Sequence, residues 1–321
     1  MGNRGRKIVT KLYLVIPCYN EEEVLPETSK RLLLKIKTLQ ETKRISDESR
    51  IVFVDDGSKD STWKLIKKYH SENSTFSGIK LSKNKGHQNA LLAGLAAVSE
   101  LADAVISLDA DLQDDINAID KMLEKFENGN DIVYGVRSSR KKDTFFKRFT
   151  AEGFYKIMSF LGADIVFNHA DYRLMSTRAL QGLLEYKEVN LFLRGIVPLI
   201  GYKSDIVSYE RSERFAGESK YPLRKMLSFA FEGITSLSVK PIRMIFSVGI
   251  IIFLISIIAM IYCLGSYLTG NTISGWTSLI MSIWLLGGLQ LIAVGMIGEY
   301  IGKVYLETKA RPKFIIEEFL H

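Results

Sequence analysis

The sequence predicts an α/β protein with a mainly parallel sheet, followed by a membrane-associated region. Two observations predict this arrangement. In the first 140 residues, apolar runs of strand length alternate with helical stretches, and residues 244–298 contain no Asp, Glu, Lys or Arg. Strand–helix alternation is typical of a parallel sheet covered on both faces. An uncharged run of that length accommodates two membrane helices.

Five strands and four helices are expected in alternating order. The strands are Leu12–Ile16, Ile51–Val54, Gly78–Leu81, Ala104–Leu108 and Ile132–Val136. The helices are Glu21–Gln40, Ser61–His70, His87–Ser99 and Ile116–Glu127. In such sheets, ligands bind beyond the carboxyl ends of the strands. The polar motifs at these ends are PCYNEE, DDGSKDST, NKGHQN, DADLQDD and GVRSSR. They predict a site at that edge.

The region after the alternating segment is harder to interpret. From Thr144 to about Tyr209 the pattern is mixed. Apolar residues then recur at three-to-four spacing over Tyr221–Val239, which predicts an amphipathic helix in the membrane interface. A helix packed on the α/β domain is the other interpretation of this stretch.

Two membrane spans are expected, Phe246–Leu264 and Trp276–Ile297, joined by a polar turn at residues 270–272. A buried core hairpin is the alternative. The connecting turn has no Lys or Arg, whereas basic residues flank both spans: Lys240, Arg243, Lys303, Lys309, Arg311 and Lys313. By the positive-inside rule, the part before the first span and both termini are expected to face the cytoplasm. The basic N-terminus is followed by no apolar stretch of signal-peptide length.

Charge and cysteine content narrow the choice of partners. The net charge of +7 is better explained by an anionic membrane and anionic substrates than by nucleic acid. Cys18 lies in the soluble part and Cys263 in a predicted span, so no disulfide is expected. The four histidines show no zinc-site spacing with these cysteines.

The sharpest chemical signal is Asp109-Ala110-Asp111, which follows an apolar strand. Two carboxylates one residue apart at a strand end can share a hard divalent cation with a diphosphate, and magnesium suits such a site. A helix N-terminus with acidic first-turn residues is the alternative. Asp114 and Asp115 fit that interpretation well.

Other strand ends offer weaker signals. Asp55-Asp56-Gly57-Ser58 can bind a nucleobase or ribose, although for the tetrapeptide in isolation an ordinary turn with a helix cap is the favoured interpretation. Tyr19 could stack on a base and Glu21 could hydrogen-bond to it, but the start of a helix explains these polar residues equally well. Basic side chains suited to phosphate are Arg137, Arg148, Arg214 and Lys220. Each of these could instead be a solvated surface charge.

Together these motifs resemble glycosyltransferase family 2. The match runs in order along nearly the whole chain: VIPCYNEEEVL, VDDGSKDST, NKGHQNALLAG, LDADLQDD, GVRSSR, YRLMS, FLRG, ERFAGESKY and RPKF. Within the family the chain looks like the polyprenyl-phosphate branch, which includes dolichol-phosphate mannose synthase and bactoprenol glucosyltransferases of the GtrB type. Asp115 stands where the family commonly has Pro, and Tyr172 where Phe is frequent.

The resemblance implies a GT-A (nucleotide-diphospho-sugar transferase) fold and a role for each matching residue. Pro17, Tyr19, Glu21 and Asp56 would hold the nucleotide. Asp109, Asp111 and Gln113 would hold Mg²⁺ (or Mn²⁺) and the diphosphate. Arg137 and Arg148 would receive the lipid phosphate, and Arg214 and Lys220 the donor diphosphate. Asp171 would approach the sugar or acceptor.

The resemblance also implies the organisation of the chain and its reaction. Residues 1–220 would form the catalytic domain, 221–243 the interfacial region, 244–298 the two spans and 299–321 a cytoplasmic tail. The expected reaction transfers glucose from UDP-glucose to undecaprenyl phosphate with inversion, and GDP-mannose is the alternative donor.

Three other functions stay open from sequence alone. A processive polysaccharide synthase would need a QxxRW motif, which the chain lacks. A ceramide-type transferase would need a base for a neutral acceptor. A non-catalytic nucleotide-sugar-binding membrane protein would keep the motifs without turnover. Small residues at Gly287, Gly288 and Gly295 are compatible with helix association within or between subunits, and so with a homo-oligomer.

Overall fold

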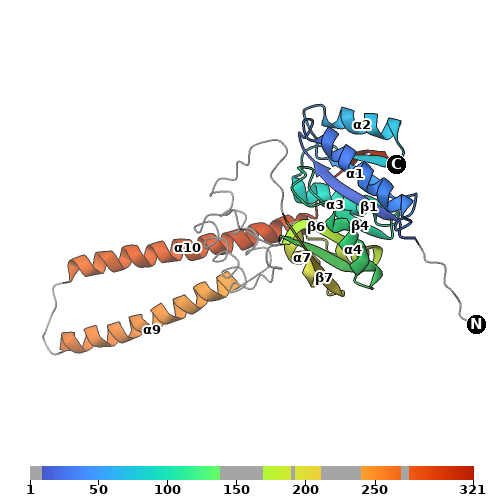
Figure 1. The fold of residues 1–321 in the computed structure, drawn as a ribbon. Helices are drawn as coiled ribbons and strands as arrows, with labels where there is room; N and C mark the ends of the chain where they lie inside the picture. The colour runs from blue at the N-terminus through green and yellow to red at the C-terminus, as the bar shows by residue number, and fades with distance from the viewer. Residues whose placement is uncertain (1–8, 138–168, 189–191, 211–239, 269–274) are drawn as a thin grey trace, which may run out of the picture. The chain divides into compact units, whose positions relative to one another are not determined.

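The structure, a computed structural model, describes residues 9–137, 169–188, 192–210, 240–268 and 275–321. Two compact units are present. Of the described residues, those up to 210 together with residues 312–321 form an α/β unit, and those between 240 and 311 form the other unit. Figure 1 shows both units and labels several of their elements.

The α/β unit contains eight strands and six helices among the described residues. The strands are β1 Leu12–Cys18, β2 Arg50–Asp55, β3 Phe76–Leu81, β4 Ala104–Ser107, β5 Ile132–Arg137, β6 His169–Ser176, β7 Ser204–Tyr209 and β8 Ile316–Leu320. The helices are α1 Leu25–Glu41, α2 Thr62–Glu72, α3 His87–Val98, α4 Ala118–Glu127, α6 Thr177–Leu184 and α7 Leu193–Leu199.

All eight strands form one mixed sheet in the order β7-β5-β6-β4-β1-β2-β3-β8. Strands β1–β4 are parallel where they pair with one another, and β5 pairs with β7 in parallel. Strand β6 lies antiparallel between β4 and β5, and β8 is antiparallel to β3. The parallel prediction therefore holds for the first four strands, while two antiparallel strands make the complete sheet mixed.

Both faces of the sheet are buried, as the continuous apolar strands predict. Successive side chains of a strand point to opposite faces. On β1, Leu12, Leu14 and Ile16 pack in one core with α1, α2 and α4. Tyr13 and Val15 pack in the other core with α3, α6 and α7. This double cover fixes the sheet, and the carboxyl ends of β1, β2 and β4 meet at one edge.

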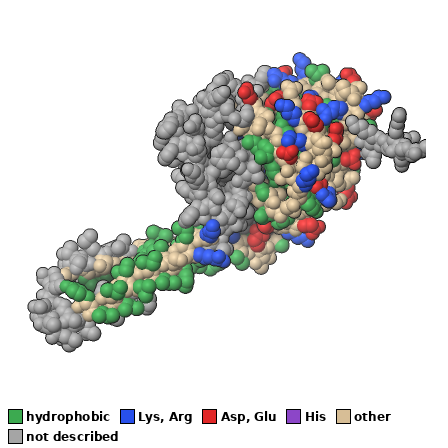
Figure 2. All heavy atoms as spheres, turned by 60° about the horizontal axis from the view of Figure 1, so that its bottom comes forward, with side chains coloured by type: hydrophobic (Ala, Val, Ile, Leu, Met, Phe, Trp, Pro, Cys, Tyr) green, Lys and Arg blue, Asp and Glu red, His purple; other side chains and the backbone are tan. Residues whose placement is uncertain are grey.

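The second unit contains two long helices, α9 Lys240–Leu268 and α10 Trp276–Lys309. The two predicted spans fall within them. Among the described residues, only Leu286–Lys309 passes a test of length and composition for crossing a membrane, and none of that segment is buried. In Figure 2, hydrophobic side chains dominate the visible surface of the helices, whereas charges of both signs dot the α/β unit. The number of spans and their orientation stay predictions.

Candidate active site

Loops at the ends of β1 and β2 are joined by hydrogen bonds that use their polar motif residues. The amide of Asp56 donates to the carbonyl of Cys18 at 2.9 Å. The amide of Asn20 donates to the hydroxyl of Ser58 at 2.9 Å. The amide of Glu21 donates to Thr62 Oγ1 at 2.9 Å. The PCYNEE and DDGSKDST motifs thus form one connected rim beside the edge of the sheet.

Asp56 extends this rim to the loop before α3. Its side chain is 2% exposed, and its two oxygens accept hydrogen bonds from the amides of Lys85 at 2.7 Å and Gly86 at 2.9 Å. Gly57 has φ +68°, and a Cβ there would lie 2.7 Å from the amide nitrogen of Asn84. Asp56 and Gly57 therefore hold the NKGH loop against the end of β2.

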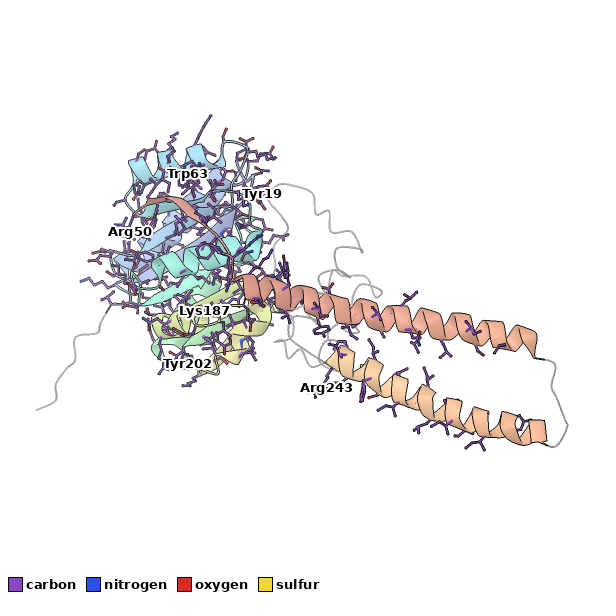
Figure 3. The ribbon with its side chains drawn as sticks, turned by 180° about the vertical axis from the view of Figure 1, so that it is seen from behind. Tyr19, Arg50, Trp63, Lys187, Tyr202 and Arg243 are labelled. Atoms are coloured by element: carbon purple, nitrogen blue, oxygen red, sulfur yellow. The ribbon has the colours of Figure 1, made fainter. Side chains whose placement is uncertain are left out.

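The other predicted nucleotide residues lie on the same rim. Pro17 is buried at the end of β1. Tyr19 is 42% exposed and lies at the surface of the α/β unit, where it is labelled in Figure 3. Glu21 is partly exposed. The structure brings these residues and Asp56 to one edge, as the motif order predicts.

The acidic motif lies directly after β4. Asp111 Oδ1 accepts a hydrogen bond of 3.1 Å from the amide of Gln113, and the intervening Leu112 has φ 57°. The Asp109 side chain is 35% exposed, yet its Oδ1 atom is buried and accepts no hydrogen bond from the described residues. Burial, together with the neighbouring carboxylates, raises the pKa of Asp109 to about 6 despite the opposing charge of His87.

A divalent cation fits these residues. No group of three or more His, Cys, Asp or Glu side chains with metal-site geometry occurs in the described part of the chain. Magnesium, however, is commonly held by one or two carboxylates together with substrate phosphates and water. The buried Oδ1 atom of Asp109, which accepts no hydrogen bond from the described residues, and the nearby Asp111 carboxylate supply such a pair.

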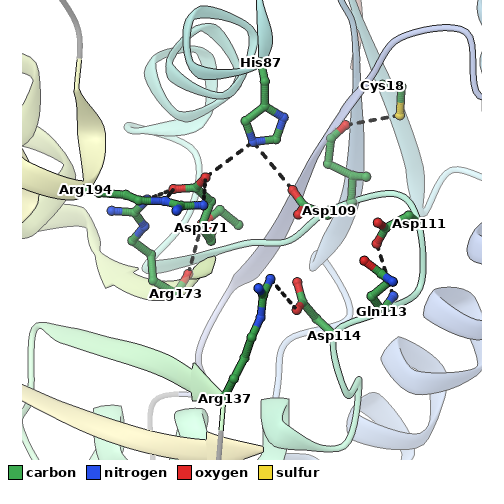
Figure 4. Close-up of polar contacts among 12 residues, drawn as sticks. Cys18, His87, Asp109, Asp111, Gln113, Asp114, Arg137, Asp171, Arg173 and Arg194 are labelled. Atoms are coloured by element: carbon green, nitrogen blue, oxygen red, sulfur yellow. Dashed lines mark hydrogen bonds and ion pairs between the residues drawn. The ribbon is translucent and has the colours of Figure 1, made fainter. Parts of the chain in front are cut away.

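Four side chains from three elements, α3, β6 and α7, form a cluster next to Asp109 (Figure 4). Nε2 of His87, the first residue of α3, lies 3.5 Å from Asp109 Oδ1 and 3.7 Å from Asp171 Oδ2. Asp171 also accepts from Arg173 at 2.6 Å and from Arg194 at 3.1 Å. Arg173 and Asp171 belong to β6, and Arg194 belongs to α7.

Charge pairing sets the ionisation of this cluster. Burial would raise the pKa of the Asp171 carboxyl, but its cationic neighbours, Arg194 first, hold that pKa well below its ordinary value. Burial disfavours the charged imidazole of His87, but the carboxylates of Asp171 and Asp109 outweigh this effect and raise its pKa. Both side chains are therefore favoured in their charged forms.

A second cluster lies below the acidic motif and involves the predicted acceptor residue Arg137. Asp114 is 6% exposed and accepts a hydrogen bond of 2.5 Å from the hydroxyl of Tyr209. Nη2 of Arg137, at the end of β5, lies 4.0 Å from the same Asp114 oxygen. Figure 4 shows Arg137 extending towards Asp114. Arg137 thus reaches the edge of the sheet occupied by the acidic motif.

Three predicted residues, Arg148, Arg214 and Lys220, lie outside the described residues. Sequence patterns did not single out three further residues of the site. His87, Arg173 and Arg194 lie in the NKGHQN, HADYR and FLRG segments of the sequence. His87 was considered only as a zinc ligand. The HADYR and FLRG segments were the available signal, but no local pattern shows that β6 pairs antiparallel with β4, which places Asp171 near Asp109 with Arg194 against Asp171.

Comparison with known proteins decides the family. The model of Glycosyl transferase family 2 matches residues 13–184. The chain belongs to this family. Family 2 membership makes the protein a sugar-transferring enzyme, and its α/β unit has the GT-A fold with a mixed sheet.

Relatives match this chain along nearly its whole length. An uncharacterized glycosyltransferase of Bacillus subtilis (strain 168), YkoT, is 56% identical over 306 residues, which cover 95% of this chain and 91% of the relative. The prophage bactoprenol glucosyl transferase homolog of Escherichia coli (strain K12) is 40% identical, covering 96% and 98%. The bactoprenol glucosyl transferase of Shigella phage SfX is 39% identical, covering 96% and 99%.

Proposed function

We propose that the protein transfers a hexose from a nucleotide-sugar donor to the phosphate of a polyprenyl lipid, with glucose from UDP-glucose as the first candidate. The observation that carries the proposal is the edge of the sheet that holds the acidic motif with Asp109 and Asp111, where Arg137 lies 4.0 Å from Asp114 of the same motif. Anionic donor and acceptor groups both need cationic partners there. The names of the relatives support the glucosyl group and the bactoprenol acceptor.

In the proposed reaction, a phosphate oxygen of the lipid attacks the anomeric carbon of the sugar. The bond from that carbon to the donor diphosphate breaks, and the nucleoside diphosphate leaves with the electron pair, so configuration inverts. The acceptor phosphate is anionic at neutral pH and carries no proton that must be removed by a base. Positioning and charge stabilisation then supply the rate enhancement.

The roles of the residues follow from their places on the edge. Asp109, Asp111 and Gln113 would hold a divalent cation, Mg²⁺ or Mn²⁺, which when bound offsets charge on the leaving diphosphate. Pro17, Tyr19, Glu21 and the rim held by Asp56 would receive the nucleotide. Arg137, with Arg148 from outside the described residues, would receive the lipid phosphate. Arg214 and Lys220 would contact the donor diphosphate.

Membrane attachment is part of the proposal. We infer that α9 and α10 form two spans with both chain ends in the cytoplasm. The apolar segment Leu286–Lys309 and the basic residues Lys303, Lys309 and Arg311 near its end support this topology. An acceptor phosphate at the membrane surface would then be available to a catalytic unit held on the same side.

The test is a donor panel with full-length protein in lipid nanodiscs and undecaprenyl phosphate as the acceptor. UDP-glucose, GDP-mannose and UDP-N-acetylglucosamine would each be supplied with magnesium, and the lipid product identified by mass spectrometry. The anomeric configuration of the product, read by NMR, is expected to be opposite to that of the donor. A lipid product with retained configuration contradicts single displacement, and transfer only from GDP-mannose changes the donor alone.

A further inference from the structure

Asp171 occupies the centre of a network of cationic side chains. Its Oδ1 atom lies 2.6 Å from Arg173 Nη2 and 3.4 Å from Arg194 Nε. Its Oδ2 atom lies 3.1 Å from Arg194 Nη2 and 3.7 Å from His87 Nε2. Its carbonyl accepts a hydrogen bond of 2.5 Å from the hydroxyl of Ser107 on β4. Both the side chain and the backbone of Asp171 are therefore fixed.

This arrangement makes Asp171 poorly suited to contact the sugar directly or to act as a general base. The carboxylate is 8% exposed as part of a buried residue, so a sugar could reach little of it. Its oxygens face N–H groups of two guanidinium side chains and an imidazole, all of which favour the ionised carboxylate. A general base must have a lone pair directed at the proton that it removes. The neighbours of Asp171 occupy those directions.

The Asp171 carboxylate instead pairs with the buried guanidinium of Arg173. The Arg173 side chain is 1% exposed, and a buried charge needs a paired opposite charge. Its second amino group lies 3.5 Å from the carbonyl of Leu193, while the amide of Leu193 donates to Gln88 Oε1 at 2.8 Å. Both the carbonyl and the amide of Leu193, the first residue of α7, therefore have side-chain partners. The next residue, Arg194, contacts Asp171.

We propose that Asp171 is a positioning residue that holds His87, which lies beside Asp109, and Arg194, which contacts Asp171 itself, and that it acts on the reaction through them. His87 and Arg194 are 45% and 33% exposed, so they are the members of the network that a substrate can reach. Asp109 is the proposed diphosphate and metal residue, and His87 lies 3.5 Å from it, where an anionic donor would bind. Arg194 lies next to this position, on the other side of the Asp171 carboxylate. The role in transfer rests on the proposed function, whereas the positioning of α7 does not.

The positioning role can be measured without substrate by hydrogen exchange on full-length protein in nanodiscs. Asp171→Asn keeps the shape of the side chain and removes its charge. It is expected to speed exchange of the amides of Leu193–Ile196 at least roughly tenfold, with α1 unchanged as the internal control. Unchanged exchange at Leu193–Ile196 overturns the proposal, whatever sugar the wild-type enzyme transfers. If Asp171→Asn does not fold, the double variant with Arg173→Met removes the uncompensated charge and takes its place.

The catalytic part is tested by a double-mutant cycle in the sugar-transfer assay. Asp171→Asn and Arg194→Gln are each expected to lower kcat roughly 10- to 100-fold, because small misplacement of a charged group is costly. Together they should cost within about threefold of the worse single variant, since both break one unit. Asp171→Glu, which keeps the charge, should recover part of the rate. Losses that multiply indicate an independent contact of Asp171 with substrate and overturn the proposal. Absence of transfer by wild-type protein would contradict the proposed function, while the exchange result would still decide the positioning of α7.

Discussion

Oδ2 of Asp56 accepts a hydrogen bond of 2.9 Å from the amide of Gly86, at the end of a loop that leads into α3. Oδ1 of Asp56 accepts a hydrogen bond from the amide of Lys85. A residue that the sequence suggests for nucleotide binding therefore also has a clear structural task. It joins the DDGS turn to the loop that precedes His87, and His87 in turn lies 3.5 Å from Asp109 of the acidic motif.

Replacing Asp56 by Ala should weaken both folding and donor binding. Two amides lose their acceptor, which costs about 1–3 kcal/mol in the free energy of unfolding, and the donor KM should rise roughly tenfold as the rim loosens. The matched control is Asp103→Ala, which removes an acceptor for the amide of Lys11 at the opposite ends of β1 and β4. An equal rise in donor KM for Asp103→Ala would mean that the effect is not local to the rim.

Gly57 should tolerate no side chain. Gly57→Ala adds a Cβ within 2.7 Å of backbone at Asn84 in a residue with φ +68°, so a drop in melting temperature of roughly 5 °C or more is expected. Gly129 has φ +82° with no atom within 4 Å of a built Cβ. Gly129→Ala therefore shows the cost of the backbone angle alone, about 1 kcal/mol. Equal losses in the two variants would contradict steric contact between the two loops.

Arg137 is expected to affect the acceptor more than the donor. Arg137→Gln removes the charge beside Asp114, and the KM for undecaprenyl phosphate should rise roughly 10-fold or more with little change in the donor KM. Arg178→Gln is the control, because Arg178 is 65% exposed and pairs with Asp131 away from this edge. A rise in the donor KM without a rise in the acceptor KM would contradict a role of Arg137 in binding the lipid phosphate.

Membrane topology can be tested by cysteine labelling in a Cys263→Ser background. Asn271→Cys in the connecting turn should react with a membrane-impermeant thiol reagent added to intact cells. Thr308→Cys, near the end of α10, should react only after the membrane is opened, because basic residues beside it favour the cytoplasmic side. Equal labelling of both positions in intact cells would contradict two spans with cytoplasmic ends.

Local pattern was sufficient for much of the fold. Each of the five predicted strands coincides with β1–β5 within a few residues, because buried parallel strands are continuous apolar runs bounded by polar turns. The four predicted helices coincide with α1–α4 within a few residues. The end of β4 and its acidic motif could also be located, since a strand end is visible in sequence.

Long-range pairing was not predictable from those patterns. Strand β6 enters antiparallel between β4 and β5, so Arg173 pairs in register with Ser107 on one side and Tyr134 on the other. An arginine in a strand reads as an exposed residue, and its burial depends on Asp171 two residues earlier. Strand β8 comes from the last residues of the chain, beyond α10, and no local signal links it to β3.

We expect Asp109 and Asp111 to support metal-dependent transfer of glucose to a lipid phosphate. The most direct measurement is the formation of undecaprenyl-phosphate glucose from labelled UDP-glucose by full-length protein, with magnesium, with a chelator, and with Asp111→Asn in magnesium. We expect lipid product with magnesium, and a fall of at least roughly 100-fold in the other two reactions. Undiminished product in the chelator and with Asp111→Asn would contradict the claim.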